Sequence, residues 1–416
     1  MSKITGNAIV GQSGGPTAAI NATLAGVIRG ALQNNSIEKI YGMINGVEGL
    51  INNNIKDLTG IFGDDKNLQM LENTPASALG SCRKKLPDLK DAGGQQVYKN
   101  IFALLDEKNI KFVFYIGGND SMDTVKKLSV YADKTGSDIK IVGVPKTVDN
   151  DLFGTDHCPG YGSAAKYIAA TCLEVCHDDA IYPLKSVVII EIMGRDAGWL
   201  TAAASLPRLN GSKSPNLLYL PEIAFSDEKF LSDIEREFKS CNSVVIAVSE
   251  GVKYENGSYV CDAGGTDGRE TDGFGHAWLS GTANVLERLV KDRFGCKVRA
   301  IELNTPQRCA SHIASLCDLN EAVQIGKSAV EAAVSGKTGV MMIFVRESSG
   351  SAPYNITIGH ENIDNIANLI RTVPVEYINA ERNGVTDECL RYILPLIAGE
   401  PNLIYENGIP KFFEIK

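Results

Sequence analysis

Two aspartates close to an amine and a hydroxyl form the most reactive combination of side chains in the sequence. Asp149 and Asp151 stand two residues apart, just after Lys146 and Thr147. In an extended segment both carboxylates face the same side, so one could accept a proton while the other held a metal or oriented a partner. Asp-Asn-Asp is also typical of a solvent-exposed turn. The nearby lysine, threonine and glycine-rich loops favour a functional pair.

Two glycine pairs predict phosphate-binding loops. Gly14-Gly15 and Gly117-Gly118 each follow an apolar run directly. Glycine lets backbone N–H groups approach a phosphate without an intervening Cβ atom, and a following helix adds its N-terminal dipole. One such pair alone could equally be a tight turn between a strand and a helix. Two pairs in comparable places favour a phosphorylated ligand.

Three arginines could clamp an anion, and one glutamate could bind a sugar. Arg195, Arg299 and Arg308 carry the planar guanidinium group that suits phosphate oxygens. Glu250 ends an apolar run, where a single carboxylate can accept hydrogen bonds from sugar hydroxyls or simply face water. Each arginine could also be an ordinary surface residue. Their function depends on whether the fold brings them to the aspartates and the glycine loops.

Two segments match the residue pattern of a generic nucleotide-binding motif but lack the surrounding sequence that the motif requires. Residues 160–165 read Gly-Tyr-Gly-Ser-Ala-Ala, which fits the dinucleotide fingerprint, but no strand precedes them. Residues 335–338 end like a P-loop, but Glu331 replaces its first glycine. We interpret both as coincidences, so an NAD-dependent oxidoreductase and a P-loop kinase are weak candidates.

Five apolar runs predict the strands that would position the candidate residues. They are rich in β-branched residues, and a polar or glycine-rich loop and a helical pattern follow each one; they span residues 8–10, 111–116, 139–144, 186–192 and 243–248. Runs of this kind are typical of buried parallel strands, and their alternation with helices predicts a doubly wound α/β fold. Such sheets bind ligands beyond the carboxyl ends of their strands. We therefore expect the candidate loops to meet at one site.

Composition and charge limit the class of protein. The 416 residues are 44% hydrophobic and 22% charged, which is ordinary for a globular protein. A net charge of −9 without a basic stripe argues against a nucleic-acid partner. The sequence has no 18-residue apolar run and no secretory layout at its start, so we expect a cytoplasmic protein with no membrane partner. The ten cysteines include no Cys-x-x-Cys pair and are expected to be buried thiols.

Four motifs, in order along the chain, resemble those of the phosphofructokinase family. They are Gly-Gly-Asn-Asp-Ser at 117–121, Pro-Lys-Thr-Val-Asp-Asn-Asp at 145–151, Met-Gly-Arg-Asp-Ala-Gly-Trp at 193–199 and Pro-Gln-Arg at 306–308. Residues 80–83 and 249–251 fill the remaining family positions. The match extends from about residue 7 to residue 320, and the C-terminal remainder matches only loosely.

The resemblance implies a domain organisation. It predicts two doubly wound, Rossmann-like domains of the phosphofructokinase type. A phosphoryl-donor domain would span residues 1–155, with the chain returning to it after about residue 306. A fructose 6-phosphate domain would span residues 156–305, and residues 320–416 would form a C-terminal extension.

The resemblance also implies roles for single residues. The family transfers a phosphoryl group to the 1-hydroxyl of fructose 6-phosphate, and Asp149 matches the base that takes the hydroxyl proton. Thr147 and Arg195 match the residues that stabilise the transferring group. The donor side would comprise Gly14, Gly15, Arg83 and Gly118, and the sugar side Thr147, Val148, Asp149, Met193, Gly194, Arg195, Glu250, Thr305, Pro306, Gln307 and Arg308. Arg299 would grip the 6-phosphate in a neighbouring subunit, which implies a homodimer or homotetramer with shared active sites.

Two positions select the phosphoryl donor in this comparison. ATP-using members have glycine where this sequence has Asp120 and Lys146. A carboxylate at position 120 would repel the α-phosphate of a nucleotide, whereas the Lys146 ammonium could neutralise pyrophosphate. Both residues would thus act in catalysis. The sequence resembles the pyrophosphate-dependent members, which implies a reversible glycolytic or gluconeogenic reaction giving fructose 1,6-bisphosphate and phosphate.

The sequence departs from the family at several positions. Asn119 stands at the first metal position, which is usually aspartate, and is a weaker ligand for the expected Mg²⁺; Asp120 or Asp149 could replace it. Thr305 stands where many relatives have His or Tyr. Ala25 stands where bacterial ATP enzymes have an arginine that binds effector phosphate, so we expect little classical effector control.

Two other functions stay open at this point. An ATP-dependent sugar-phosphate kinase would differ in the donor, and a related acceptor such as sedoheptulose 7-phosphate would fit the same clamps. A non-catalytic, sugar-phosphate-binding relative is the second alternative, since Asn119 weakens the metal position. An assay for fructose 1,6-bisphosphate with each donor would separate all three.

Overall fold

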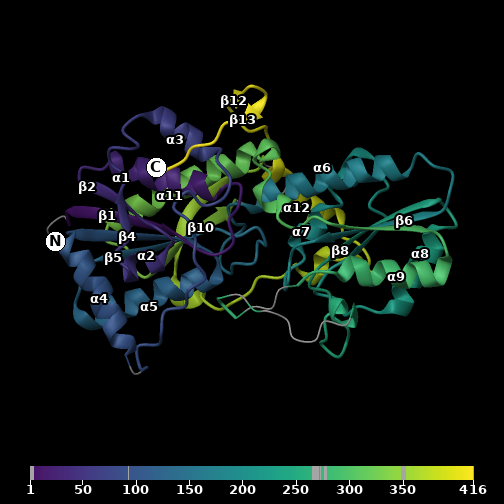
Figure 1. The fold of residues 1–416 in the computed structure, drawn as a ribbon, viewed down its shortest axis with the longest axis horizontal. Helices are drawn as coiled ribbons and strands as arrows, with labels where there is room; N and C mark the ends of the chain where they lie inside the picture. The colour runs from purple at the N-terminus through teal and green to yellow at the C-terminus, as the bar shows by residue number, and fades with distance from the viewer. Residues whose placement is uncertain are drawn as a thin grey trace.

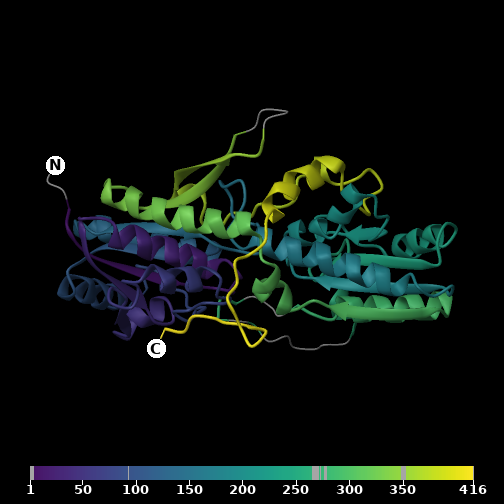
Figure 2. The ribbon, with the colours of Figure 1, turned by 90° about the horizontal axis from the view of Figure 1, so that it is seen from above.

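Two sheets, one in each lobe of an elongated molecule, form the framework of the computed structural model (Figure 1). The structure describes residues 4–91, 93–264, 271, 273–275, 279–347 and 353–415. Helices cover both faces of each sheet, so each lobe has three layers (Figures 1 and 2). The expected α/β fold with two doubly wound, Rossmann-like lobes is confirmed.

Seven strands form the first sheet. Their bounds are β1 (Gly6–Gln12), β2 (Ile37–Met43), β3 (Ile55–Asp57), β4 (Ile110–Gly117), β5 (Lys140–Pro145), β10 (Val340–Arg346) and β11 (Ile356–Asn362). The order is β11-β10-β5-β4-β1-β2-β3. The central strands run parallel, and only the two edge strands, β3 and β11, run antiparallel to their neighbours. The carboxyl ends of β1, β4 and β5 therefore lie at one edge of this sheet.

Side chains of alternate residues in the central strands pack against helices on opposite faces. Ala8 and Val10 of β1 lie in one buried cluster and Ile9 lies in the other. The first face is covered by α1 (Ile20–Leu32), α3 (Asp65–Glu72) and α11 (Leu316–Val334), and the second by α2 (Val47–Ile51), α4 (Gly94–Glu107) and α5 (Asn119–Thr135). Burial of both faces explains why these strands read as continuous apolar runs.

Helices α1 and α11 touch through glycines. A Cβ atom on Gly26 would lie 2.1 Å from the carbonyl oxygen of Val323, and one on Gly326 would lie 2.3 Å from that of Thr23. No side chain larger than glycine fits at either position without moving a backbone. Ala25, next to this contact, is fully buried.

Four parallel strands form the second sheet. Their bounds are β6 (Ser186–Ile192), β7 (Leu217–Tyr219), β8 (Ser243–Ser249) and β9 (Lys297–Glu302), and their order is β7-β8-β6-β9. One face packs against α6 (Tyr161–Asp179), α7 (Trp199–Ala203) and α12 (Asp387–Ile393). The other face packs against α8 (Asp227–Glu237) and α9 (Thr282–Phe294).

The short helix α10 (Pro306–Cys309) lies where the chain returns from the second lobe to the first. Short 3₁₀ helices complete the helical structure: η1 (Leu206–Asn210), η2 (Val260–Gly264), η3 (Ser311–Ile313), η4 (Ile363–Asn365), η5 (Val375–Tyr377) and η6 (Leu394–Ile397).

The C-terminal hundred residues belong to both lobes. After β10 and β11 complete the first sheet, α12 packs on the second lobe. The tail, with the small hairpin β12 (Tyr405–Glu406) and β13 (Ile409–Pro410), then crosses back to the first lobe (Figure 2). There the rings of Phe413 and Phe62 lie 5.1 Å apart. The C-terminal extension expected from the sequence is thus part of both lobes. The expected domain boundaries at residues 155 and 305 stay predictions.

All five strands predicted from the sequence occur, as β1, β4, β5, β6 and β8. The five runs leave out the other strands of the two sheets, β2, β3, β7, β9, β10 and β11. Of these, β2 and β9 keep exposed polar side chains that interrupt the apolar pattern. All ten cysteines are free thiols, six of them buried. Within the described ranges, no helix combines the length and the apolar character that crossing a membrane requires.

Candidate active site

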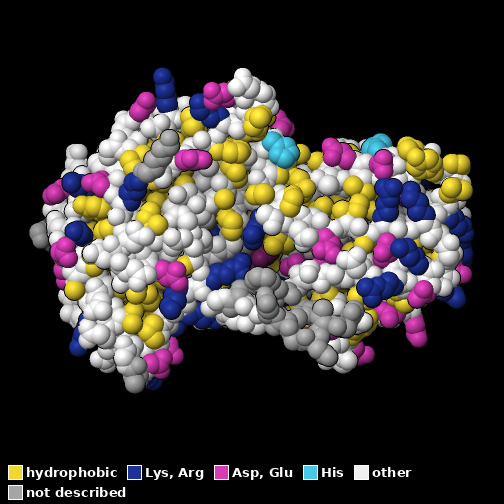
Figure 3. Space-filling model, viewed as in Figure 1, with side chains coloured by type: hydrophobic (Ala, Val, Ile, Leu, Met, Phe, Trp, Pro, Cys, Tyr) yellow, Lys and Arg dark blue, Asp and Glu magenta, His cyan; other side chains and the backbone are white. Residues whose placement is uncertain are grey.

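A cavity of about 430 Å³ lies between the lobes, at the carboxyl ends of strands from both sheets. Lys and Arg side chains gather at this waist of the molecule (Figure 3). Fourteen of the residues predicted from the sequence line the cavity: Gly14, Gly15, Arg83, Gly118, Asn119, Asp120, Lys146, Thr147, Val148, Asp149, Met193, Arg195, Glu250 and Arg308. The fold therefore brings the separate motifs to one site.

Cationic groups surround the first glycine loop. Lys146, only 3% exposed, donates a hydrogen bond of 2.7 Å from Nζ to the carbonyl oxygen of Gly15. A Cβ atom on Gly15 would lie 3.3 Å from the guanidinium of Arg308 and 3.9 Å from that of Arg83. Burial lowers the pKa of Lys146 to about 8, and the two arginines add to this shift while nearby carboxylates oppose it. An anion in this cradle would stabilise all three cations.

The second glycine loop presents Asp120 in the first turn of α5. Its carboxylate lies 3.2 Å from Nζ of Lys85. The Asp120 side chain is 19% exposed and that of Lys85 is 50% exposed, so the pair lies at the mouth of the cavity. Lys85 was not among the residues predicted from the sequence, although it belongs to the basic run Arg83-Lys84-Lys85 next to a family motif.

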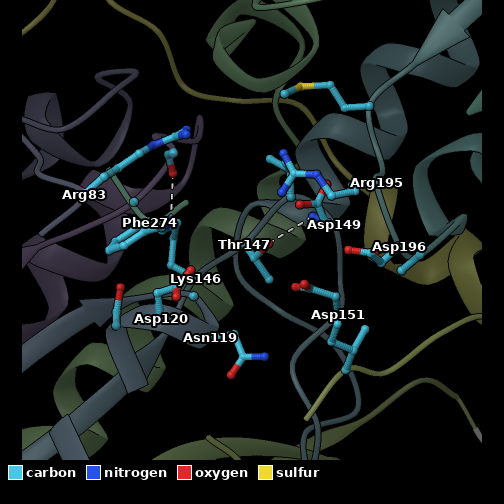
Figure 4. A pocket seen from close by; sticks show the side chains of 18 of the residues that line it. Arg83, Asn119, Asp120, Lys146, Thr147, Asp149, Asp151, Arg195, Asp196 and Phe274 are labelled. Carbon is cyan, nitrogen blue, oxygen red and sulfur yellow. Dashed lines mark hydrogen bonds between the residues drawn. The ribbon is translucent and has the colours of Figure 1, made fainter. Parts of the chain in front are cut away.

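Asp149 and Asp151 lie on a turn, and both still face the cavity (Figure 4). The expectation of an extended segment is wrong, because Asn150 between them has a φ of 56°. The Asn150 side chain fixes this turn: its Oδ1 accepts a 3.0 Å hydrogen bond from the Cys158 N–H, and its Nδ2 donates to the Tyr392 hydroxyl. Asparagine tolerates this left-handed conformation better than most residues.

The environment of Asp149 suits a proton acceptor. Burial raises the pKa of Asp149, and repulsion from Asp151 adds to the rise. Arg195 and Lys146 oppose it. The backbone N–H of Asp149 donates a 3.2 Å hydrogen bond to the hydroxyl oxygen of Thr147, which holds the two side chains on the same wall (Figure 4). A carboxylate whose pKa is raised toward neutrality can take a proton more effectively than an ordinary aspartate.

The wall formed by the second lobe carries Glu250 and the loop that follows β6. Oε1 of Glu250 accepts a hydrogen bond of 3.4 Å from the N–H of Gly194. Burial and the charge of Asp149 raise the pKa of Glu250 to about 8. The N–H of Met193 donates to Oε1 of Gln307 at 3.1 Å, so Gln307 holds the loop from behind. This wall offers a carboxyl group to a polyhydroxylated ligand.

Five predicted residues do not line the cavity. Gly194 and Gln307 lie behind the lining, whereas Thr305 and Pro306 are exposed at the start of α10. Arg299 lies on the edge strand β9, where its 56% exposed side chain lies 3.8 Å from Asp178 of α6. Within this chain Arg299 thus does not contribute to the cavity.

The cavity also includes residues to which the sequence motifs assigned no role. Asp196 belongs to a motif but had no role of its own, and Phe274 lies outside the motifs, whereas Asp151 was already expected to act as a pair with Asp149. Asn368 and Ile370 come from the C-terminal part of the chain. No pattern in the sequence connects that part with the motifs.

Asn119 contacts the C-terminal part of the chain. Its Oδ1 accepts a 2.6 Å hydrogen bond from the Asn368 N–H, and its Nδ2 donates a 2.9 Å hydrogen bond to the Leu369 carbonyl oxygen. Both ends of the amide therefore have backbone partners. Among the described residues, no group of three or more His, Cys, Asp or Glu side chains could hold a metal ion alone. The cavity also contains the carboxylates of Asp120 and Asp151, and Mg²⁺ in proteins commonly takes one or two carboxylates plus substrate phosphates.

The backbone N–H groups at the helix start, residues 160–165, already bind a side chain of this chain. The carboxylate of Asp318 accepts hydrogen bonds from the N–H groups of Gly160 and Ser163, each 2.9 Å long. This carboxylate occupies the position that a nucleotide phosphate would need. The dinucleotide-like spelling is therefore a coincidence, as the sequence context predicted.

Comparison with known proteins assigns the chain to a family. The family model described as Phosphofructokinase matches residues 7–333. The chain belongs to the phosphofructokinase family. A relative from Halomonas elongata named pyrophosphate–fructose 6-phosphate 1-phosphotransferase is 38% identical over 408 residues, which are 97% of this chain and 95% of that protein.

Two solved structures named pyrophosphate-dependent phosphofructokinase resemble the whole chain. The one from Nitrosospira multiformis has a TM-score of 0.85 and covers 98% of this chain and 95% of its own. The one from Marinobacter aquaeolei has a TM-score of 0.86 and covers 99% and 96%. Both are 36% identical to this chain. The similarity to these phosphofructokinases extends beyond the motifs into the C-terminal part, which the motif comparison matched only loosely.

Proposed function

We propose that this protein transfers a phosphoryl group reversibly from pyrophosphate to the 1-hydroxyl of fructose 6-phosphate, giving fructose 1,6-bisphosphate and phosphate. The observation that carries the proposal is the position of Lys146. Its ammonium lies at the Gly14-Gly15 loop, in the cavity that also contains Asp149. The names of the full-length relatives support pyrophosphate as the donor.

The cradle around Gly15 would bind pyrophosphate. Lys146, Arg83 and Arg308 supply three positive charges, and the glycine loop allows close backbone approach. Binding the anion would also restore the ordinary pKa of Lys146, since a negative charge next to an ammonium favours its protonated form.

Asp149 would take the proton of the sugar 1-hydroxyl as that oxygen attacks the phosphorus atom. Arg195 and Thr147 lie beside Asp149 on the cavity wall and would stabilise the charge on the equatorial oxygens of the transferring group (Figure 4). Transfer leaves inorganic phosphate in the cradle. Because the bond broken and the bond formed are similar in energy, the reaction should run in both directions.

Glu250 and Met193 would hold the sugar on the wall of the second lobe, with Gly194 supporting Glu250 from behind. Arg308, which also belongs to the cradle, would contact the sugar from the side of the donor. Arg299 would act in a neighbouring subunit of a homodimer or homotetramer. Its exposure on the edge strand β9 supports this role, because the side chain is available to a second copy.

Magnesium would take part as a cofactor. Asp120 and Asp151, together with pyrophosphate oxygens, would hold Mg²⁺, which supplies charge neutralisation for the donor. A cytoplasmic location fits the glycolytic sugar phosphates and the ten free thiols.

One experiment separates this function from its alternatives. The protein is incubated with fructose 6-phosphate, Mg²⁺ and either donor, and fructose 1,6-bisphosphate is measured by a coupled assay. We expect product with pyrophosphate, and release of pyrophosphate when fructose 1,6-bisphosphate and phosphate are supplied instead. A non-catalytic relative would give no product with either donor, and an ATP kinase would give product with ATP only.

A further inference from the structure

Six residues of the C-terminal part, 368–373, run along the cavity and contact both lobes. Asn368 and Ile370 line the cavity. The preceding residues Ile366 and Ala367 are buried in the core of the first lobe, and Val373 is buried in the core of the second. We call residues 368–373 the cross-pocket segment.

The first contact of this segment is with the loop that carries Asp120. Asn119, the residue before Asp120, accepts the hydrogen bond from the Asn368 N–H and donates one to the Leu369 carbonyl oxygen. An aspartate at position 119 could accept the first hydrogen bond, but its second oxygen would face the carbonyl oxygen of Leu369. The asparagine thus matches the segment in a way that the usual family residue does not.

The second contact is with the loop that carries Asp149. Ile370 forms an antiparallel bridge with Leu152. The N–H of Arg371 donates a 2.8 Å hydrogen bond to the Asp151 carbonyl oxygen, and its Nη1 donates a 3.3 Å hydrogen bond to that of Asn150. The backbone on the C-terminal side of Asp149 is therefore held by this segment.

The third contact is with the end of the loop that carries Arg195. The guanidinium of Arg371 lies 4.3 Å from the ring centroid of Trp199, and the indole N–H donates a 3.2 Å hydrogen bond to the Arg371 carbonyl oxygen. Oε1 of Glu222 accepts hydrogen bonds of 2.8 Å from both the Val373 N–H and the Gly198 N–H. The loop between Arg195 and Trp199 is thus fixed to the same segment.

We propose that the cross-pocket segment sets the relative positions of the three loops that carry Asp120, Asp149 and Arg195. Asn119 and Arg371 are its positioning residues, and Asn119 acts through the segment rather than as a metal ligand. The proposal rests on the proposed function, because these loops hold the donor, the base and the transferring group. In-line transfer needs reacting atoms about 3 Å apart, and a misplacement of about 1 Å can cost roughly a hundredfold in rate.

Substitution of Asn119 distinguishes positioning from metal binding. We expect Asn119→Asp and Asn119→Ala each to lower kcat about tenfold or more, with KM changed less than about threefold and the Mg²⁺ requirement unchanged. If Asn119 were instead a metal ligand, Asn119→Asp should have the opposite effect. The added carboxylate should lower the Mg²⁺ concentration needed for half-maximal activity and keep or raise kcat. That result would overturn the proposal. Lys126→Ala is the matched control, because Lys126 lies on the same helix and pairs with Asp364, outside the segment.

Arg371→Lys tests the contacts of the cross-pocket segment with the loops that carry Asp149 and Arg195, and it keeps the positive charge. Lysine cannot reproduce the planar stacking and the fork of hydrogen bonds, so we expect kcat to fall about tenfold without loss of folding. The Asn119→Ala/Arg371→Lys double variant should be no more than about threefold worse than the poorer single variant, because both act through one segment. Fully multiplicative losses would show that the two residues act separately.

Amide hydrogen exchange gives a readout that does not depend on activity. In Asn119→Asp, the amides of Arg371 and Val373 should exchange at least about tenfold faster than in the wild type, whereas Lys126→Ala should leave them unchanged. Unchanged exchange in Asn119→Asp would overturn the proposal even if activity fell. If the wild type shows no transferase activity, the proposed function fails, and the exchange result still decides whether Asn119 holds the segment.

Discussion

The Lys85 ammonium lies 3.2 Å from the Asp120 carboxylate at the mouth of the active-site cavity. The sequence suggested that Asp120 would repel a nucleotide through its negative charge. The structure shows that a cation offsets part of that charge. We therefore expect discrimination against ATP to depend on the pair rather than on Asp120 alone, since removing one partner leaves the charge of the other unbalanced.

Asp120→Gly should therefore admit ATP as a weak donor. The substitution removes the repulsive carboxylate and leaves Lys85 available to a nucleotide phosphate. We expect kcat/KM for ATP to rise at least about tenfold, which corresponds to roughly 1.4 kcal/mol. Lys84→Ala is the control, because Lys84 is exposed in the same basic run and does not line the cavity. An unchanged ATP rate would show that the carboxylate does not exclude nucleotides.

Lys146→Gly should lower kcat with pyrophosphate by at least about a hundredfold, the range seen when one preorganised donor to a developing charge is removed. Lys146 is buried at the glycine loop, so no other ammonium can replace it without rearrangement. Combining Lys146→Gly with Asp120→Gly should give a non-additive effect, because both residues belong to one network of charges. Retention of more than a tenth of wild-type kcat would contradict the role of Lys146.

Asp149→Ala should abolish the proton-accepting step and leave sugar binding intact. We expect kcat to fall at least about a hundredfold, the lower range for loss of a general base. Calorimetry with fructose 6-phosphate should show a dissociation constant within about threefold of the wild-type value, because sugar contacts lie mainly on the other wall. Near-normal turnover would remove Asp149 from the mechanism.

ADP and phosphoenolpyruvate should hardly change the saturation curve for fructose 6-phosphate. Ala25, at the position of the effector-binding arginine in the bacterial ATP enzymes, is buried beside the contact between Gly26 and α11. An arginine would not fit there, and no phosphate can reach this point of α1. A tenfold shift of half-saturation by either compound, roughly 1.4 kcal/mol of coupling, would contradict this prediction.

His157 should make stability depend on pH. Its buried ring forms hydrogen bonds of 2.8 Å with Asp156 and 2.7 Å with Glu321, and these carboxylates also contact Arg346 and Tyr354 respectively. Burial alone would lower the pKa of His157, but the two carboxylates outweigh it and raise the pKa above its usual value.

A raised folded-state pKa stabilises the protein at pH below about 6.5, the usual pKa of histidine, and this contribution disappears as pH rises through the folded-state pKa. His157→Asn should therefore cost about 3 kcal/mol of unfolding free energy at pH 6 and less at pH 9. Urea unfolding of both proteins at the two pH values measures the difference. A cost that grows with pH would mean that the ring is neutral in the folded protein.

Much of the fold was predictable because a strand that is buried on both faces of its sheet consists mainly of apolar residues. Strands β4 and β6 read as runs of mainly apolar residues, and the loops after them carry motifs in an order specific to one family. Strand β2 was missed because Glu38 and Lys39 are exposed, so Ile37–Met43 mixes charged and apolar side chains.

The site was predictable where a residue follows directly on a strand end, and not where a distant segment completes it. Lys146 and Asp149 follow β5, so the topology alone places them together. The hydrogen bond between Asn119 and Asn368 joins residues 249 positions apart, and neither side chain signals the other in a single sequence. The turn at Asn150 was missed for a related reason, since its φ depends on contacts with Cys158 and Tyr392.

Asp120 and Lys146 are expected to make pyrophosphate the phosphoryl donor. The most direct test is the ratio of the wild-type kcat/KM values for pyrophosphate and ATP, measured with saturating fructose 6-phosphate and Mg²⁺. We expect a ratio of at least about a thousand in favour of pyrophosphate, which corresponds to roughly 4 kcal/mol. Comparable values for the two donors, or a preference for ATP, would contradict it.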